Sequence, residues 1–141
     1  LLPTLDEPLL VINGDILTGV HFDDMLTFHR EQRAELTVAV RHCELQVPYG
    51  VLDCDGGYVR DVREKPRQQY FVNAGIYLLQ PSVRDVIPAE GRFDMTDVIR
   101  ALIEAGRPVA SFPVVEYWLD IGQRTDYERA QADVRSGLVG A

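Results

Sequence analysis

The stretch that decides the fold is Leu9-Leu10-Val11-Ile12-Asn13-Gly14-Asp15, near the beginning of the sequence. A short apolar run that ends in a turn sequence is typical of a strand buried on both faces, as in a parallel sheet. Apolar residues then recur at helical spacing over residues 22–29, and a second apolar run, L-T-V-A-V, occupies residues 36–40. A strand, a helix and a second strand in this order predict a βαβ unit.

The middle of the chain has a different pattern. Two β-prone segments, at residues 49–52 and 58–62, flank the sequence Asp53-Cys54-Asp55-Gly56-Gly57. An Asp-Gly pair between such segments predicts a β-hairpin. Residues 71–79 are typical of a further strand, interrupted by Asn73-Ala74-Gly75, and a helical turn is expected at residues 81–87.

The last third of the chain predicts a helix, a strand and a final helix. Asp94 or Thr96 can cap the first helix, and Gly106 and Pro108 end it. Its expected apolar face consists of Val98, Ile99, Leu102 and Ile103. A strand is expected at residues 109–115. Thr125 and Glu128 match a capping box for the last helix, which has Tyr127, Ala130 and Val134 on one side and ends at Gly137.

Length and composition bound the remaining possibilities. A chain of 141 residues fits one domain, so we expect a single α/β domain over residues 1–141, with a mixed, mostly parallel sheet flanked by helices and an inserted hairpin. A net charge of −8 argues against nucleic-acid or anionic-membrane partners. No apolar run approaches the roughly 20 residues of a membrane helix. Cys43 and Cys54 fit no metal-ligand spacing, which favours two thiols in a reducing, cytoplasmic setting.

Two carboxylates are candidate metal ligands. Asp15 follows Gly14 at the carboxyl end of the first strand, where open α/β sheets bind ligands, and Mg²⁺ prefers one or two carboxylates with phosphate oxygens and water. Asn-Gly-Asp is equally a turn sequence. Asp120 lies in the apolar string W-L-D-I-G, where it either binds metal or accepts backbone hydrogen bonds.

Other polar residues are candidates for holding a substrate. Pro66 favours an extended Lys65, whose ammonium would then project toward a phosphate, although a solvated surface lysine is the alternative. Asn73 and Gly75 offer hydrogen bonds and room for a polar ligand such as a sugar, or they mark a β-bulge. Tyr49 and Gly50 admit the same two interpretations. The D-x-D letters at residues 53–55 are better explained as the tip of the hairpin.

Six strings in this order resemble the sugar-1-phosphate nucleotidyltransferases, such as glucose-1-phosphate thymidylyltransferases and mannose-1-phosphate guanylyltransferases. The strings are V-I-N-G-D at 11–15, P-Y-G-V at 48–51, E-K-P at 64–66, V-N-A-G-I-Y at 72–77, F-D-M at 93–95 and W-L-D-I-G at 118–122. The resemblance implies the Rossmann-like nucleotide-diphospho-sugar transferase fold. It further implies that the chain corresponds to the later, C-terminal part of the catalytic domain, with that fold's first strands upstream of Leu1.

The resemblance also assigns roles to residues. It implies that Asp15 and Asp120 bind a catalytic Mg²⁺ and that Lys65 contacts the sugar phosphate. It implies that Gly14, Tyr49, Gly50, Glu64, Asn73 and Gly75 contact the substrate. The expected reaction joins an NTP and a sugar 1-phosphate, by attack of a sugar-phosphate oxygen on the α-phosphorus and release of pyrophosphate.

One departure from the family pattern changes what we expect of the chain alone. The family's Gly-rich opening signature, which resembles G-x-G-T-R-L and cradles the NTP phosphates, is not in this sequence. We therefore expect an incomplete domain without turnover of its own. The alternative is a non-catalytic module that binds a sugar phosphate or a nucleotide sugar. Uncovered sheet edges and apolar surface would favour self-association, so a homo-oligomer is expected.

Overall fold

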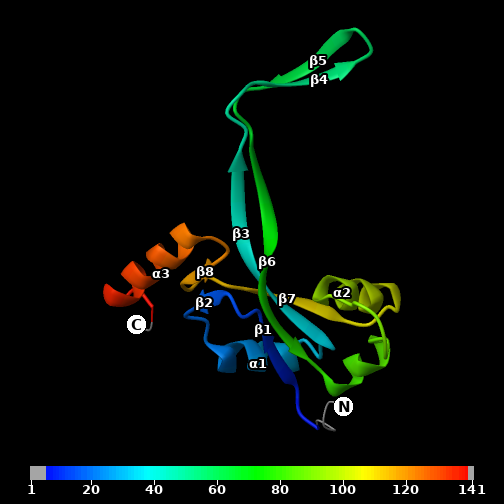
Figure 1. The fold of residues 1–141 in the computed structure, drawn as a ribbon. Coiled ribbons are helices and arrows are strands. Elements are labelled where there is room, and N and C mark those ends of the chain that lie inside the picture. Colours follow the sequence, from blue (N-terminus) through cyan, green and yellow to red (C-terminus); the bar gives the residue numbers. More distant parts are fainter. Residues whose placement is uncertain (1–5, 140–141) are drawn as a thin grey trace.

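Four strands form the central sheet, in the order β1-β6-β3-β7, and two shorter pairs, β2-β8 and β4-β5, stand apart from it. The computed structural model describes residues 6–139 (Figure 1). Its elements are β1 (Leu9–Ile12), β2 (Ile16–Thr18), α1 (Phe22–Glu31), β3 (Leu36–Gln46), β4 (Val51–Asp55), β5 (Tyr58–Arg63), β6 (Arg67–Leu79), the 3-10 helix η1 (Pro81–Val86), α2 (Met95–Glu104), β7 (Val109–Pro113), β8 (Trp118–Asp120) and α3 (Arg124–Arg135).

The expected mixed sheet flanked by helices is confirmed, but two of its three strand pairings are antiparallel, so the pairing is not mostly parallel as expected. β6 runs antiparallel to both β1 and β3, and β3 runs parallel to β7. β1 and β3 therefore run in the same direction, as a βαβ unit requires, with β6 between them. β1 is an edge strand rather than a strand buried on both faces, and Ile12 is 40% exposed. An apolar run of four residues does not distinguish these two positions.

The core lies on both faces of the sheet. On one face, α1 buries Met25 against the side chains of Ala74, Ile76 and Leu78. On the other face, α2 buries Val98 and Leu102 against neighbours that include Tyr77. Successive residues of β6 alternate between the two clusters because side chains of a strand point to opposite faces in turn. β6 is thus the strand that joins the two halves of the core.

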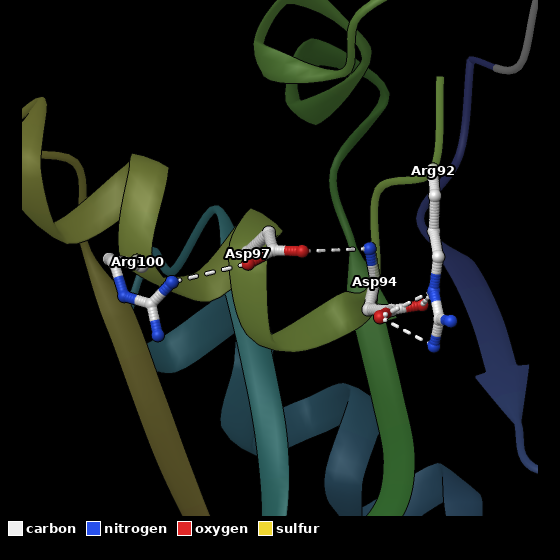
Figure 2. A network of polar contacts seen from close by, with 4 residues as sticks. All are labelled: Arg92, Asp94, Asp97 and Arg100. Carbon is white, nitrogen blue, oxygen red and sulfur yellow. Dashed lines mark hydrogen bonds and ion pairs between the residues drawn. The ribbon is translucent and has the colours of Figure 1, made fainter.

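The first turn of α2 shows how its start is fixed. Asp94 is the N-cap, as expected, and the Asp97 carboxylate accepts a hydrogen bond from the backbone N–H of Asp94 at 3.1 Å (Figure 2). The same carboxylate pairs with Arg100, and Asp94 pairs with Arg92. One residue of the expected apolar face, Ile103, is 61% exposed, because the covered stripe of this helix is narrower than its run of apolar residues.

The last helix begins earlier than predicted. Gln123, not Thr125, is the N-cap of α3, and Asp126 accepts the hydrogen bond from the backbone of Gln123 at 2.9 Å. The sequence has two overlapping cap patterns, and the one nearer to β8 forms because the chain leaves that strand only three residues earlier. Gly137 follows the helix with a φ of 77°, the left-handed conformation that glycine adopts without strain.

A long two-stranded arm projects from the sheet. We define the arm as residues 41–72: the far halves of β3 and β6 together with the β4–β5 hairpin (Figure 1). The predicted hairpin is confirmed, with its D-x-D letters in β4 beside the Gly56-Gly57 turn. Every residue of β5 is exposed. Within residues 6–139, no helix combines the length and the apolar character needed to cross a membrane.

Candidate functional site

Two acidic residues from distant parts of the sequence meet where β2 pairs with β8. Asp15 lies in the turn that precedes β2, and Asp120 is the last residue of β8. Ile16 lies directly opposite Asp120 in this ladder, and the backbone N–H of Ile121 donates to the carbonyl oxygen of Asp15 at 2.8 Å. Asp15 and Asp120, which we call the carboxylate pair, therefore occupy adjacent rungs, and both are exposed.

A bulge in β6 lies against the chain that leads to this pair. Asn73 of β6 opposes Val40 and Tyr77 opposes Val38, so residues 74–76 face a single residue of β3; we call these three residues the bulge. Gly75 has a φ of 72°, and its carbonyl oxygen accepts a hydrogen bond from the backbone N–H of Asn13 at 2.8 Å. The expected interruption at residues 73–75 is confirmed as a β-bulge, and its sugar-binding role stays a prediction.

The bulge needs glycine at residue 75. A Cβ atom at this position would lie 2.8 Å from Nδ2 and 3.0 Å from Cγ of Asn13, closer than side chains tolerate. The positive φ adds a second requirement for glycine. The bulge can therefore pack directly on Asn13, two residues before Asp15.

Asn73 is exposed, and hydrogen bonds within β6 hold both ends of its side-chain amide. Its Oδ1 accepts from the backbone N–H of Gly75 at 2.9 Å, and its Nδ2 donates to the hydroxyl of Tyr77 at 2.7 Å. These bonds hold the bulge in shape. Sequence analysis did not identify Tyr77 in this role, since an Asn and a Tyr four residues apart meet only if the strand between them is bulged.

The other predicted substrate contacts lie in the arm, where the β3–β6 ladder ends and the β4–β5 hairpin begins. Tyr49 and Gly50 precede β4, and Glu64 and Lys65 follow β5; residues 47–50 and 64–66 form what we call the elbow. The backbone N–H of Lys65 donates to the carbonyl oxygen of Tyr49 at 3.3 Å, and a Cβ on Gly50 would lie 3.1 Å from Oε2 of Glu64. The structure thus brings these four residues together.

The backbone of Lys65 differs from the prediction. Lys65 has a φ of 44° and is not extended, although a residue before proline usually is. The chain must bend from the β4–β5 hairpin into the β3–β6 ladder within the three residues between β5 and β6, and the left-handed Lys65 lies in this bend (Figure 1). Its backbone N–H is held by Tyr49, and the direction in which its ammonium projects is set by the turn rather than by a strand.

The structure therefore divides the predicted site residues into two groups. Gly14, Asp15, Asn73, Gly75 and Asp120 lie at the body of the protein; Tyr49, Gly50, Glu64 and Lys65 lie at the elbow. Along β6, six residues lead from Asn73 to Arg67 beside the elbow. At about 3.3 Å per residue this separation is about 20 Å.

The donor set at the carboxylate pair fits Mg²⁺. This ion takes one or two carboxylates and completes its shell with water and phosphate oxygens, and the two exposed carboxylates, whose backbones adjoin at the start of β2 and the end of β8, are donors of this type. In the part of the chain that the structure describes, no three His, Cys, Asp or Glu side chains group as metal ligands.

The strand β8 is also anchored to α3. The hydroxyl of Tyr117 donates to the Asp133 carboxylate at 2.6 Å, and the hydroxyl of Thr18 donates to the carbonyl oxygen of Tyr117 at 3.0 Å. Burial, together with the hydrogen bond to Asp133, raises the pKa of Tyr117. Tyr117 therefore stays protonated at neutral pH and keeps its role as a donor.

Solved structures with the same arrangement of strands and helices identify the fold. A structure described as a candidate glucose-1-phosphate thymidylyltransferase from Bacillus anthracis superposes with a TM-score of 0.64 at 21% identity, over 94% of this chain and 56% of that one. HddC from Yersinia pseudotuberculosis gives a TM-score of 0.61 at 23% identity, over 91% of this chain and 56% of that one. The chain has the Rossmann-like nucleotide-sugar transferase fold, as expected.

Sequence comparison gives the family. The model of the nucleotidyl transferase family matches residues 2–137, and the chain belongs to this family. It is 32% identical to the mannose-1-phosphate guanyltransferase beta-A of Xenopus laevis, over 90% of this chain and 36% of that protein. It is 31% identical to the UTP–glucose-1-phosphate uridylyltransferase of Synechocystis, over 95% of this chain and 37% of that protein. The chain spans little more than a third of these relatives, and the matched stretch belongs to their N-terminal part rather than to their C-terminal end.

Proposed function

We propose that this chain carries part of the active site of an enzyme that transfers a nucleotidyl group from an NTP to a sugar 1-phosphate. The observation that carries the proposal is the carboxylate pair, in which the register of β2 and β8 brings together Asp15 and Asp120, 105 residues apart. The family and its sugar-1-phosphate relatives support the substrate class.

The proposed reaction joins two anions. An oxygen of the sugar phosphate forms a bond to the α-phosphorus of the NTP, and the bond from that phosphorus to the pyrophosphate oxygen breaks. Catalysis of such a transfer consists mainly of positioning and charge neutralisation. Mg²⁺, when bound, supplies positive charge against the phosphate oxygens.

The chain's own residues would then hold the reactants. Asp15 and Asp120 would bind the metal ion, and the Lys65 ammonium would bind the sugar phosphate as a point charge. Asn73 would present to the sugar the one lone pair and one N–H that its internal bonds leave over. Because Lys65 lies at the elbow, its contribution requires the arm to bend toward the body.

A titration tests this proposal. The chain is titrated calorimetrically with GDP-mannose, UDP-glucose, mannose 1-phosphate and glucose 1-phosphate, each with and without Mg²⁺. We expect Mg²⁺-dependent binding that weakens about tenfold in Asp15→Asn. The matched control is Asp53→Asn, which removes an equally exposed carboxylate from the hairpin and should leave binding unchanged.

Turnover distinguishes the enzyme from its alternative. Pyrophosphate release is measured on the same samples and on any longer form of the protein that contains the family's Gly-rich signature. Binding without release by such a form would favour the non-catalytic binding module, which the separation of Lys65 from the carboxylate pair also suits. That the chain alone does not turn over, and that it self-associates, remain predictions; light scattering tests the second. Equal effects of both Asn variants on binding would contradict the assignment of Asp15.

A further inference from the structure

The side chain of Trp118 connects the two parts of the chain that carry the carboxylate pair. Its indole N–H donates to the carbonyl oxygen of Ala74, in the bulge, at 2.8 Å. Trp118 pairs with Thr18 at the far end of the short β2–β8 ladder, two residues before Asp120. A three-residue strand makes few backbone hydrogen bonds, so a side-chain hydrogen bond from its first residue contributes strongly to holding the strand in place.

The bulge holds the opposite strand in the same way. The carbonyl oxygen of Gly75 accepts from the backbone N–H of Asn13, two residues before Asp15. Consecutive carbonyl groups of the bulge, at Ala74 and Gly75, therefore each hold a residue that precedes one member of the carboxylate pair. The bulge therefore helps to fix the positions of both carboxylates relative to each other.

The bulge itself is rigid enough for this purpose. Ala74 is fully buried and belongs to the core cluster against which the Trp118 ring packs. Asn73, directly before the bulge, accepts from Gly75 within it and donates to Tyr77 directly after it, and Tyr77 is only 3% exposed. Because the Ala74 carbonyl oxygen is fixed in the core, the hydrogen bond from the Trp118 indole N–H restrains the position of β8.

We propose that Trp118 is a positioning residue that holds Asp120 beside Asp15 through the hydrogen bond from its indole N–H to the carbonyl oxygen of Ala74. The inference rests on the proposed function, in which the carboxylate pair binds a divalent cation. Trp118 acts through Asp120 and need not touch the ion. Partners that orient metal ligands from outside the coordination shell typically change metal affinity by about 10–100-fold.

The test uses Mn²⁺ alone as the probe, with free Mn²⁺ measured by electron paramagnetic resonance. Trp118→Phe keeps an aromatic ring and removes the N–H, and we expect Mn²⁺ to bind about tenfold more weakly. The matched control is Tyr117→Phe, which removes a hydrogen bond from the adjacent residue to α3 and should leave affinity unchanged. Affinities are compared well below the unfolding midpoint of every variant, so a loss of stability alone does not change them.

The outcomes separate the inference from the proposed function. If Asp120→Asn abolishes Mn²⁺ binding and Trp118→Phe binds as the wild type does, the proposed function stands and the inference is wrong. If the wild-type chain binds no Mn²⁺, both are overturned. If Trp118→Phe and Tyr117→Phe weaken binding equally, the effect is a general one on β8 and the inference is again wrong.

A second measurement needs no variant at residue 118. Trp118 is the only tryptophan of the sequence, so the indole N–H gives a single NMR signal. We expect this signal to be protected from solvent exchange and to shift when Mg²⁺ binds in the wild type but not in Asp120→Asn. A signal that exchanges freely, or that ignores Mg²⁺ while the ion binds, would overturn the inference even if Trp118→Phe does not fold.

Discussion

His29 is a fully buried titratable residue of α1, and its hydrogen bonds require the neutral form. Its Nε2 lies 3.1 Å from the amide nitrogen of Gln80, which is a donor, so Nε2 accepts. Its Nδ1 lies 2.7 Å from Oγ1 of Thr37 and donates to it. A proton on Nε2 would face the Gln80 amide donor. Burial, with a smaller effect of the neighbouring Arg30 charge, accordingly lowers the pKa of His29.

This arrangement predicts how stability depends on pH. Above the unfolded-state pKa of about 6.5, His29 is neutral in both states and has no effect on the slope. As pH falls through that value toward the lower folded pKa, only the unfolded chain takes up the proton, so the free energy of unfolding decreases. The contribution is at most about 1.4 kcal/mol per pH unit.

Urea unfolding between pH 8 and pH 5 measures the effect. We expect His29→Gln to flatten the decrease relative to the wild type. The control is His21→Gln, because His21 is exposed and its loss should leave the slope unchanged. A slope equally steep in His29→Gln would show that other groups cause the acid sensitivity.

At the scale of the element, the start of α2 depends on one carboxylate. Asp97 accepts the hydrogen bond from the backbone of Asp94 and pairs with Arg100 (Figure 2). Loss of a cap interaction costs about 1 kcal/mol, and we expect Asp97→Ala to lower the free energy of unfolding by about this amount. Asp97→Asn keeps an oxygen acceptor and should cost about half as much. Equal losses in the two variants, measured by chemical denaturation, would show that the charge and not the acceptor matters.

The elements show what the sequence could predict. The longer strands, the helices and the hairpin were predictable because the period of the apolar residues and the turn residues are local signals. β2 and β8 were not predicted: each has only three residues, and their pairing joins segments about 100 residues apart. The position of β1 at the sheet edge depends in the same way on the insertion of β6 beside it. The left-handed Lys65 lies in the bend at the elbow, which no neighbouring residue specifies.

The candidate site has the same division between local and long-range information. Asp15 and Asp120 were predictable as candidates from their strings, and their adjacency in space comes from the β2–β8 register. The hydrogen bonds that Tyr77 makes to Asn73 and Trp118 makes to Ala74 were not predictable, because both depend on a register shift in β6. A single sequence shows which residue types are present, but which of them contact one another depends on the tertiary structure.

At the scale of the whole molecule, the arm divides the predicted site. The carboxylate pair lies at the body, and the elbow with Lys65 lies beyond the far end of β6, about 20 Å along that strand from Asn73 (Figure 1). Beyond residue 47, the hairpin contributes no residue to either core cluster of the described chain. A two-stranded hairpin is only marginally stable by itself, so the arm and the body should differ in stability.

A deletion separates the two groups of residues. Gln46 and Arg67 are directly paired in the β3–β6 ladder, so residues 47–66 can be replaced by Asn-Gly, which suits a two-residue turn between paired strands. We expect the shortened chain to unfold cooperatively with a midpoint within about 4 °C of the wild type, the shift that roughly 1 kcal/mol would cause.

The shortened chain should also keep one binding activity and lose the other. Because the body keeps Asp15, Asp120 and Trp118, it should bind Mn²⁺ with unchanged affinity. Because it lacks Lys65 and Glu64, it should lose affinity for sugar 1-phosphates. The matched control is Lys65→Gln in the chain without the deletion, which should reproduce the loss of sugar-phosphate binding without any change in Mn²⁺ binding. If the deletion abolishes Mn²⁺ binding while the body stays folded, the elbow takes part in the metal site and the division into two groups is wrong.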